Sequence, residues 1–283
     1  MQLCLSLVLA SAAALHHSPP PRPIRRRAFG AAALGSCACW ACGGPAEALA
    51  SLTAPRAETL ARFDLPRDAT KDRRFARGMA TGMVAYEAAV APTKRRLFDA
   101  LLPTLPRDAV VLELGIGSFP NAPFYDAARA PLDVVGVDPN DSMETFALQA
   151  AAPLLSAGSS VRVVHGVAEA LPFADNTVDA VTCTLTLCSV PSPSAALAEV
   201  SRVLRPGGKL LFLEHVLSET DPKLQALQRA FSPLQVETAD GCHLDRRTLE
   251  TIRAAGFASV DAQYFELNDF LYLNPTVAGI ATA

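Results

Sequence analysis

Residues 109–118 read AVVLELGIGS, and this stretch decides the fold. Five of its first six residues are apolar, and two of these are β-branched, which is typical of a short buried strand. Gly115 and Gly117 follow at once. Two glycines here let the backbone pass close to a ligand and turn tightly into a helix. The stretch therefore predicts a strand whose carboxyl end opens into a binding loop.

Further strands and helices alternate along the rest of the chain. Apolar, β-branched-rich segments predict strands at 132–138, 161–165, 178–184 and 209–214, and the intervening pattern predicts helices at 94–102, 143–155, 193–204 and 249–255. Asp141 and Ser142 are the expected cap of the second helix, and Pro206-Gly207-Gly208 is the expected end of the third. Strands that alternate with helices predict an α/β fold with a parallel, doubly wound sheet covered on both faces.

The composition bounds the kind of protein. The chain has 283 residues, is 50% hydrophobic and carries a formal net charge of −3. One ordinary globular domain with an appendage fits that length, and the charge gives no reason to expect nucleic-acid binding.

Residues 1–50 predict a cleavable leader. No acidic residue precedes Glu47, three arginines stand together at 25–27, and apolar runs occupy 3–15 and 31–44. Two such runs around a basic spacer resemble the bipartite leaders of algae with complex plastids, and Arg26-Arg27 resembles a twin-arginine signal. The predicted location is the plastid, in the stroma or thylakoid; a membrane anchor with an endomembrane location is the alternative.

Candidate binding residues follow the strand ends, where ligands bind in open α/β sheets. Asp138 ends the second strand, and a carboxylate there can accept both hydroxyls of a ribose. Ala168 and Glu169 follow the third strand and can frame an adenine edge. Thr184 and Leu185 end the fourth. A nicotinamide fingerprint needs a third glycine where this chain has Pro120, so hydride transfer is disfavoured.

Together these motifs resemble the class I methyltransferases of the type 11 group, and more closely the methyltransferase-like proteins that include thiol S-methyltransferases. The similar stretches are 113–117, 137–140, 168–173, 175–179, 183–190, 199–208, 213–216 and 240–244. The resemblance implies a Rossmann-like, seven-stranded single domain at 106–283 behind an N-terminal helical cap at 51–105.

The resemblance also implies the activity, which is methyl transfer from S-adenosyl-L-methionine to a small-molecule acceptor, with a thiol as the favoured acceptor. A plastid quinone or other lipophilic phenol is the alternative acceptor, and a non-catalytic cofactor-binding protein is the alternative function. The implied cofactor-binding residues are Glu113, Gly115, Gly117, Asp138, Pro139, Asn140, Ala168, Glu169, Thr184 and Leu185. Phe119 departs from the family loop, which usually has glycine there; its ring either crowds the methionine end of the cofactor or swings outward.

Catalytic candidates lie beyond the fourth strand. His215 follows the fifth strand and is the candidate base, with Asp240 and His243 in a later loop as further candidates. His165 is expected to be structural. Cys183, Cys188 and Cys242 have no ligand-like spacing, so we expect small buried residues and no metal site.

The expected partners are a small-molecule acceptor and no nucleic acid, with the chain a monomer. Residues 94–96 (Lys-Arg-Arg) weakly indicate peripheral contact with an anionic membrane, although a solvated helix face explains them as well. Residues 231–238 are expected to form part of a lid over the acceptor.

Overall fold

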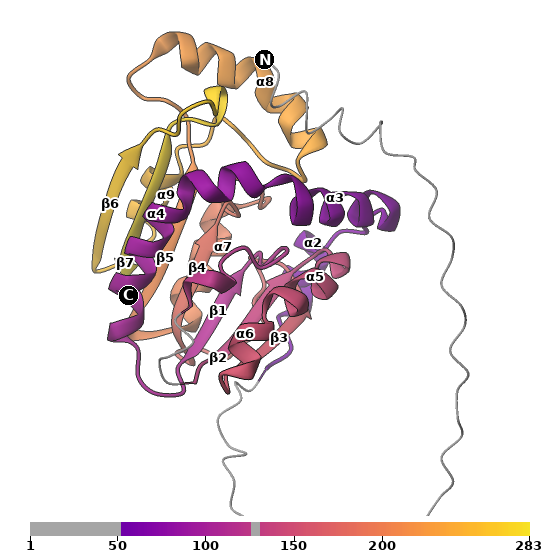
Figure 1. The fold of residues 1–283 in the computed structure, drawn as a ribbon, viewed down its shortest axis with the longest axis vertical. Helices are drawn as coiled ribbons and strands as arrows, with labels where there is room; N and C mark the ends of the chain where they lie inside the picture. The colour runs from indigo at the N-terminus through magenta and orange to yellow at the C-terminus, as the bar shows by residue number, and fades with distance from the viewer. Residues whose placement is uncertain (1–51, 126–130) are drawn as a thin grey trace, which may run out of the picture. The chain divides into compact units, whose positions relative to one another are not determined.

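Seven strands form one mixed sheet in the order β3-β2-β1-β4-β5-β7-β6, with β7 antiparallel to its neighbours (Figure 1). The computed structural model describes residues 52–125 and 131–283, so the predicted leader lies outside the described residues. The strands are β1 (Val110–Leu114), β2 (Asp133–Asp138), β3 (Ser160–His165), β4 (Val178–Thr184), β5 (Leu204–His215), β6 (Ser259–Phe265) and β7 (Thr276–Thr282). The predicted doubly wound α/β fold is confirmed.

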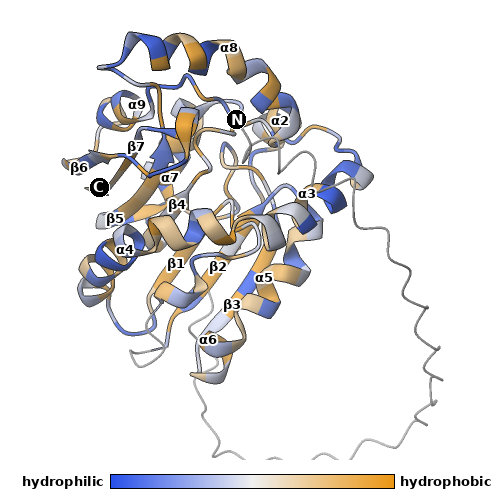
Figure 2. Ribbon diagram, turned by 45° about the horizontal axis from the view of Figure 1, so that its top comes forward, coloured by the Kyte–Doolittle hydropathy of each residue, from blue (hydrophilic) through white to orange (hydrophobic). Residues whose placement is uncertain are grey.

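Helices cover both faces of the sheet. On one face α4 (Val84–Leu101), α5 (Glu144–Ala150) and α6 (Ala152–Ser156) contribute to one buried cluster, with Val111 and Leu211 from the strands. On the other face α7 (Pro193–Val203) and α9 (Thr248–Ala254) pack on Leu112 and Val181. The central strands are accordingly the most hydrophobic part of the fold (Figure 2).

Three expectations about helices were wrong in detail. The predicted helix at 143–155 is divided at Ala151, because Pro153 lies in the first turn of a second helix that begins at Ala152. The cap ahead of the whole segment is Asn140 rather than Asp141 or Ser142. Residues 206–208 lie inside β5, since Leu204 already pairs with Val178.

The loop after β1 does not continue into an α-helix within the described residues. It leads instead into the 3₁₀ turn η2 (Ala122–Phe124). Pro120 and Pro123 explain this, because each fixes its own backbone and disfavours helical geometry in the residue before it.

Residues 94–96 are not a free basic patch. Lys94 is fully buried and forms a 2.7 Å ion pair with Glu87. Arg95 stacks over the ring of Phe124, and Arg96 donates to Gln263. Arg95 and Arg96 are exposed, so the solvated helix face describes two of the three residues, and contact with a membrane stays a prediction.

The remaining helices gather at the carboxyl edge of the sheet, where α3 and α8 lie beyond the strand ends (Figure 1). They are α2 (Ala57–Phe63), α3 (Ala69–Gly82) and α8 (Pro222–Thr238). Short 3₁₀ turns are η1 (Leu102–Thr104), which precedes the amino end of β1, and η3 (Asp141–Met143) and η4 (Leu271–Leu273). None of the helices in the described part of the chain is both long and apolar enough to span a bilayer.

Candidate functional site

The glycine loop after β1 (residues 115–117) packs closely against Thr186 in the turn after β4. Gly115 has a φ of +65°, and a Cβ added there would lie 2.5 Å from Thr186 Oγ1. That hydroxyl donates to Leu114 O over 2.9 Å. Gly117 has a φ of +53°, and a Cβ added there would meet nothing closer than Gly115 O at 3.9 Å. The loop therefore requires glycine for contact at the first position and leaves open space beside the second.

Asp138 faces that loop from the end of β2. Its carboxylate accepts the Gly117 N–H over 2.9 Å and the Asn140 N–H over 2.8 Å. Burial raises the pKa of Asp138 to about 6, with Asp240 adding to the rise and the two N–H groups and Arg67 opposing it. Each carboxylate oxygen keeps a second lone pair, so Asp138 can accept further donors from a ligand.

Residues 139 and 140 connect this strand end to the N-terminal helices. Pro139 is partly exposed, whereas Asn140 is buried. Asn140 Oδ1 accepts the Ser142 N–H, and its Nδ2 donates to Asp72 O in α3 over 3.1 Å. The side chain of Asn140 thus connects the end of β2 to the N-terminal helical cap through α3, while its backbone N–H orients Asp138.

The third predicted segment presents an acceptor that has no partner. Ala168 and Glu169 are both buried. Glu169 Oε1 accepts the Ser192 N–H over 2.8 Å, but its Oε2 is buried without any hydrogen bond to a described residue. Such an orphaned acceptor is suited to an N–H donor on a ligand.

Glu113 lies beneath the loop and shapes it. Its carboxylate accepts the Tyr125 hydroxyl over 2.6 Å and Asn121 Nδ2 over 3.1 Å, and burial raises its pKa against these bonds. Asn121 also donates to Thr184 Oγ1 over 3.1 Å, while its own Oδ1 is a second buried acceptor that no described residue satisfies. Leu185, with a φ of +56°, begins the adjacent turn.

Phe119 points away from the open side of the loop. Its side chain is 0% exposed and lies within the buried cluster on the α4 face, with its ring centroid 5.8 Å from that of Tyr125. A positive φ of +58° turns the residue in this direction. Of the two placements expected from the sequence, neither describes this one, because the ring is inside the core.

A buried carboxylate fixes the turn after β4. Glu214, at 0% exposure, accepts the N–H groups of Thr186 and Leu187 over 2.9 Å each and that of Cys188 over 3.2 Å. An acidic residue within an apolar strand is a detectable sequence signal. Sequence reasoning nevertheless missed Glu214 as a positioning residue.

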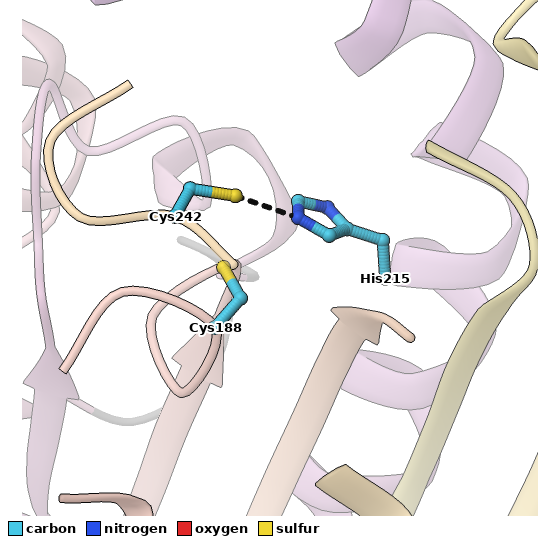
Figure 3. A group of neighbouring side chains, drawn as sticks. All are labelled: Cys188, His215 and Cys242. Carbon is cyan, nitrogen blue, oxygen red and sulfur yellow. Dashed lines mark hydrogen bonds between the residues drawn. The ribbon is translucent and has the colours of Figure 1, made fainter. Parts of the chain in front are cut away.

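The three catalytic candidates lie close to this turn. His215 is 5% exposed, and its Nε2 is 2.8 Å from Cys242 Sγ, so its ring faces a thiol (Figure 3). Asp240 pairs with Arg67 over 2.7 Å. The His243 backbone N–H donates to Cys188 O, and its side chain lies 3.8 Å from Asp245.

Arg67, between α2 and α3, had no sequence signal. It bridges Asp72 at 2.8 Å and Asp240 at 2.7 Å, and so ties the cap to the 240–243 loop. His165 does similar work as a structural residue, because it lies 2.7 Å from Asp141 and 3.1 Å from Asp64.

A cavity of about 400 Å³ borders the third predicted segment. Residues 53–56 line one side and residues 169–171 the other, with Arg202 and Glu199 between them. Neither the glycine loop nor Asp138 lines it. The candidate site therefore consists of the glycine loop, Asp138 and the two acceptors without a hydrogen-bond partner among the described residues, Glu169 Oε2 and Asn121 Oδ1. Such acceptors can bind hydroxyl and amino donors.

Comparison with known proteins agrees with this geometry. The model of a family described as a methyltransferase domain matches residues 112–212, which run from β1 to β5. Rat thiol S-methyltransferase TMT1B is 36% identical over 173 residues, which cover 60% of this chain and 70% of the relative. Human thiol S-methyltransferase TMT1A is 33% identical over 185 residues, which cover 65% of this chain and 75% of the relative.

Solved structures share the fold. A SAM-dependent methyltransferase from Thermotoga maritima superposes with a TM-score of 0.53 at 20% identity, covering 75% of this chain and 98% of the other. At that identity the likeness concerns the fold alone.

Proposed function

This chain belongs to the S-adenosylmethionine-dependent methyltransferases of the family that includes the thiol S-methyltransferases, and on that premise we propose that its acceptor is a small, apolar thiol. The enzyme transfers a methyl group to a small molecule. The observation that carries the choice of a thiol is the 33–36% identity to thiol S-methyltransferases over 70–75% of their length.

The residues present fit the cofactor. S-adenosylmethionine supplies a methyl group already activated on a sulfonium, so the protein mainly aligns and desolvates the reactants. Asp138 would accept the ribose hydroxyls, and Glu169 Oε2 would accept an amino group of the adenine, next to Ala168. Asn121 Oδ1, a buried acceptor without a hydrogen-bond partner among the described residues, would accept from the ammonium of the methionine end. Gly115 and Gly117 would let that end pass.

A thiol suits the chemistry of the acceptor side. A useful fraction of a thiol is already thiolate near neutral pH, so transfer needs no strong base. The expected base, His215, is buried with Nε2 against Cys242, and His243 is about one-third exposed beside Asp245. A phenol has a pKa near 10, so its methylation depends more than that of a thiol on a catalytic base such as His215 or His243.

Apolar side chains on α8 support a lipophilic acceptor. Leu227, Phe231 and Leu234 are spaced four and three residues apart, which places them on one helix face, and all three are exposed. Phe231 stacks on Tyr272 at 5.3 Å. The loop that carries Asp240 and His243 follows this helix directly. Residues 231–238 remain our proposal for a lid over the acceptor.

An acceptor panel tests the proposal. The purified chain is incubated with labelled S-adenosylmethionine and matched pairs of alkyl and aryl thiols and the corresponding alcohols and phenols. We expect methylation of the thiols, with kcat/KM rising with alkyl length. Transfer to quinols or phenols but not thiols would replace the proposed acceptor, and cofactor binding without transfer to any acceptor would contradict it.

Replacement of Phe119 by a smaller residue tests whether its ring limits the affinity for the cofactor. Phe119→Leu is expected to leave the cofactor Kd within about threefold and to destabilise the fold by about 1 kcal/mol, because the ring packs in the core. Calorimetric titration and thermal melting measure the two effects. A Kd at least tenfold tighter in the variant would mean that the ring occupies cofactor space.

Cofactor affinity is expected to fall as the solution is acidified. The pKa of Asp138 in the free protein is about 6, and the ribose hydroxyls favour its ionised form. Ionised Asp138 is mostly present at pH 7 and falls to about one-tenth at pH 5, so Kd should rise about tenfold over that range. In Asp138→Asn the response should disappear. A similar response in that variant would assign it to another group, such as Glu169.

Location and assembly stay proposals. We propose a plastid enzyme, in the stroma or at the thylakoid, from the two apolar runs and basic spacer of residues 1–50, and a monomer without nucleic-acid partners from its charge of −3. Peripheral membrane contact would use the α8 face rather than residues 94–96. Mass spectrometry of the mature N-terminus and sedimentation test these points, and an unprocessed N-terminus would contradict the leader.

A further inference from the structure

Three side chains with metal-binding atoms converge at the carboxyl edge of the sheet (Figure 3). Cys188 comes from the turn after β4, His215 ends β5, and Cys242 lies in the loop after α8. Their ligand atoms all lie within 4.8 Å of one another. Exposed fractions of 1%, 5% and 5% place the group inside the protein.

The surrounding backbone holds the three segments together. Glu214 accepts the Cys188 N–H, and the His243 N–H donates to Cys188 O over 2.9 Å. Gly241 has a φ of +85°, and a Cβ there would lie 2.8 Å from Ser189 O, so glycine is required for the two loops to meet. Cys242 is thereby fixed beside Cys188.

The ligand set and the charge both suit zinc. Thiolate sulfur and imidazole nitrogen are preferred zinc ligands, and at bond lengths of about 2.3 and 2.0 Å they lie about 3.5–3.8 Å apart around a tetrahedral ion. Movements below about 1 Å would convert the present cluster into that geometry. Two thiolates neutralise one Zn²⁺, so the bound cluster would carry no net charge into a buried site.

We propose that Cys188, His215 and Cys242 bind one Zn²⁺ ion, which fastens the turn after β4, the end of β5 and the loop after α8 to one another. Three protein ligands leave one position of a tetrahedron for a small fourth ligand. The proposal does not depend on the identity of the methyl acceptor. It replaces the expectation of no metal site, which considered spacing along the chain and not in space.

The test measures metal content in the full chain. All samples carry Cys4, Cys37, Cys39 and Cys42 replaced by serine, so that the leader contributes no thiols. Elemental analysis after zinc loading and desalting is expected to give about one zinc per chain, falling at least tenfold in Cys188→Ala and Cys242→Ala. Cys183→Ala is the matched control, because Cys183 is buried nearby but outside the cluster, and it should retain the zinc.

A second measurement covers variants that fail to fold. Cobalt loading of the protein with all three described cysteines intact should give thiolate-to-cobalt charge-transfer bands and the visible bands of a tetrahedral site. Folded protein without bound zinc or cobalt bands would overturn the proposal. So would zinc retained in Cys188→Ala. Loss of two of the three remaining free thiols in denatured, unreduced protein would do the same, since it would indicate a Cys188–Cys242 disulfide.

Discussion

Asp138→Ala is expected to weaken S-adenosylmethionine binding by about 100-fold or more. The variant removes a charged acceptor from two ribose hydroxyls, and hydrogen bonds to charged groups contribute about 1.5–3 kcal/mol each. Two such bonds correspond to at least about 3 kcal/mol, and 1.4 kcal/mol is a factor of ten in Kd. The Gly117 N–H also loses its partner, so the glycine loop is less well ordered in the variant. Calorimetric titration measures the change.

The matched control is Asp133→Ala, at the opposite end of the same strand. Asp133 is also buried, and it pairs with Arg162 over 3.1 Å and with Ser160. Its removal should lower the melting temperature while the cofactor Kd stays within about threefold. Equal losses of affinity in the two variants would show that damage to β2, and not loss of a ligand contact, explains Asp138→Ala.

Glu214→Ala is expected to destabilise the fold by about 3–5 kcal/mol. Three backbone N–H groups lose their common, fully buried acceptor, and each unsatisfied buried donor costs about 1–3 kcal/mol. Removal of a buried charge returns part of this cost, because the carboxylate no longer has to be desolvated. For a domain of this size the melting temperature should fall by about 10 °C. Thermal and denaturant unfolding measure the effect.

Glu219→Ala supplies the control for Glu214. Glu219 lies in the same loop region but its side chain is 42% exposed, with Arg247 at 3.7 Å, so the expected change is under about 0.5 kcal/mol. Glu214→Gln should fall between the two, because it keeps one oxygen acceptor. If Glu214→Ala melted within 2 °C of the parent, the turn after β4 would owe its shape to other contacts. We also expect Glu214→Ala to bind the cofactor more weakly, since Thr186, in the turn that Glu214 holds, lies against Gly115 of the glycine loop.

The N-terminal cap and the 240–243 loop meet over the predicted cofactor edge. Arg67 contacts Asp240 from the cap, and Asn140 contacts Asp72 from the end of β2. Consecutive contacts therefore connect the cofactor residues and the cap to the proposed zinc cluster. Glu214 forms the link, because it accepts the N–H groups of both Thr186 and Cys188. Metal loading and cofactor affinity can be measured on the same sample, which tests whether the two sites are coupled.

The sequence by itself determined that the chain forms an α/β sheet, where five of its strands lie along the chain, and that Asp138 ends the second of them. These features are written locally, since apolar runs of strand length, glycine turns and a strand-end carboxylate keep their meaning wherever the chain goes. The two boundary errors have different causes. Pro153, a local signal, divided the helix predicted at 143–155. The pairing of Leu204 with Val178 drew residues 206–208 into a strand, and strand pairing is not a local property.

Only the tertiary structure decided what the side chains meet. Phe119 turned inward because a buried cluster on the α4 face receives its ring, and Lys94 became buried because Glu87 lies opposite it. Cys188, His215 and Cys242 stand 27 residues apart or more, so no spacing rule joins them. Strand order places the ends of β4 and β5 side by side, and the loop after α8 closes over them. Contacts of that range depend on the packing of the whole sheet, which the local sequence does not specify.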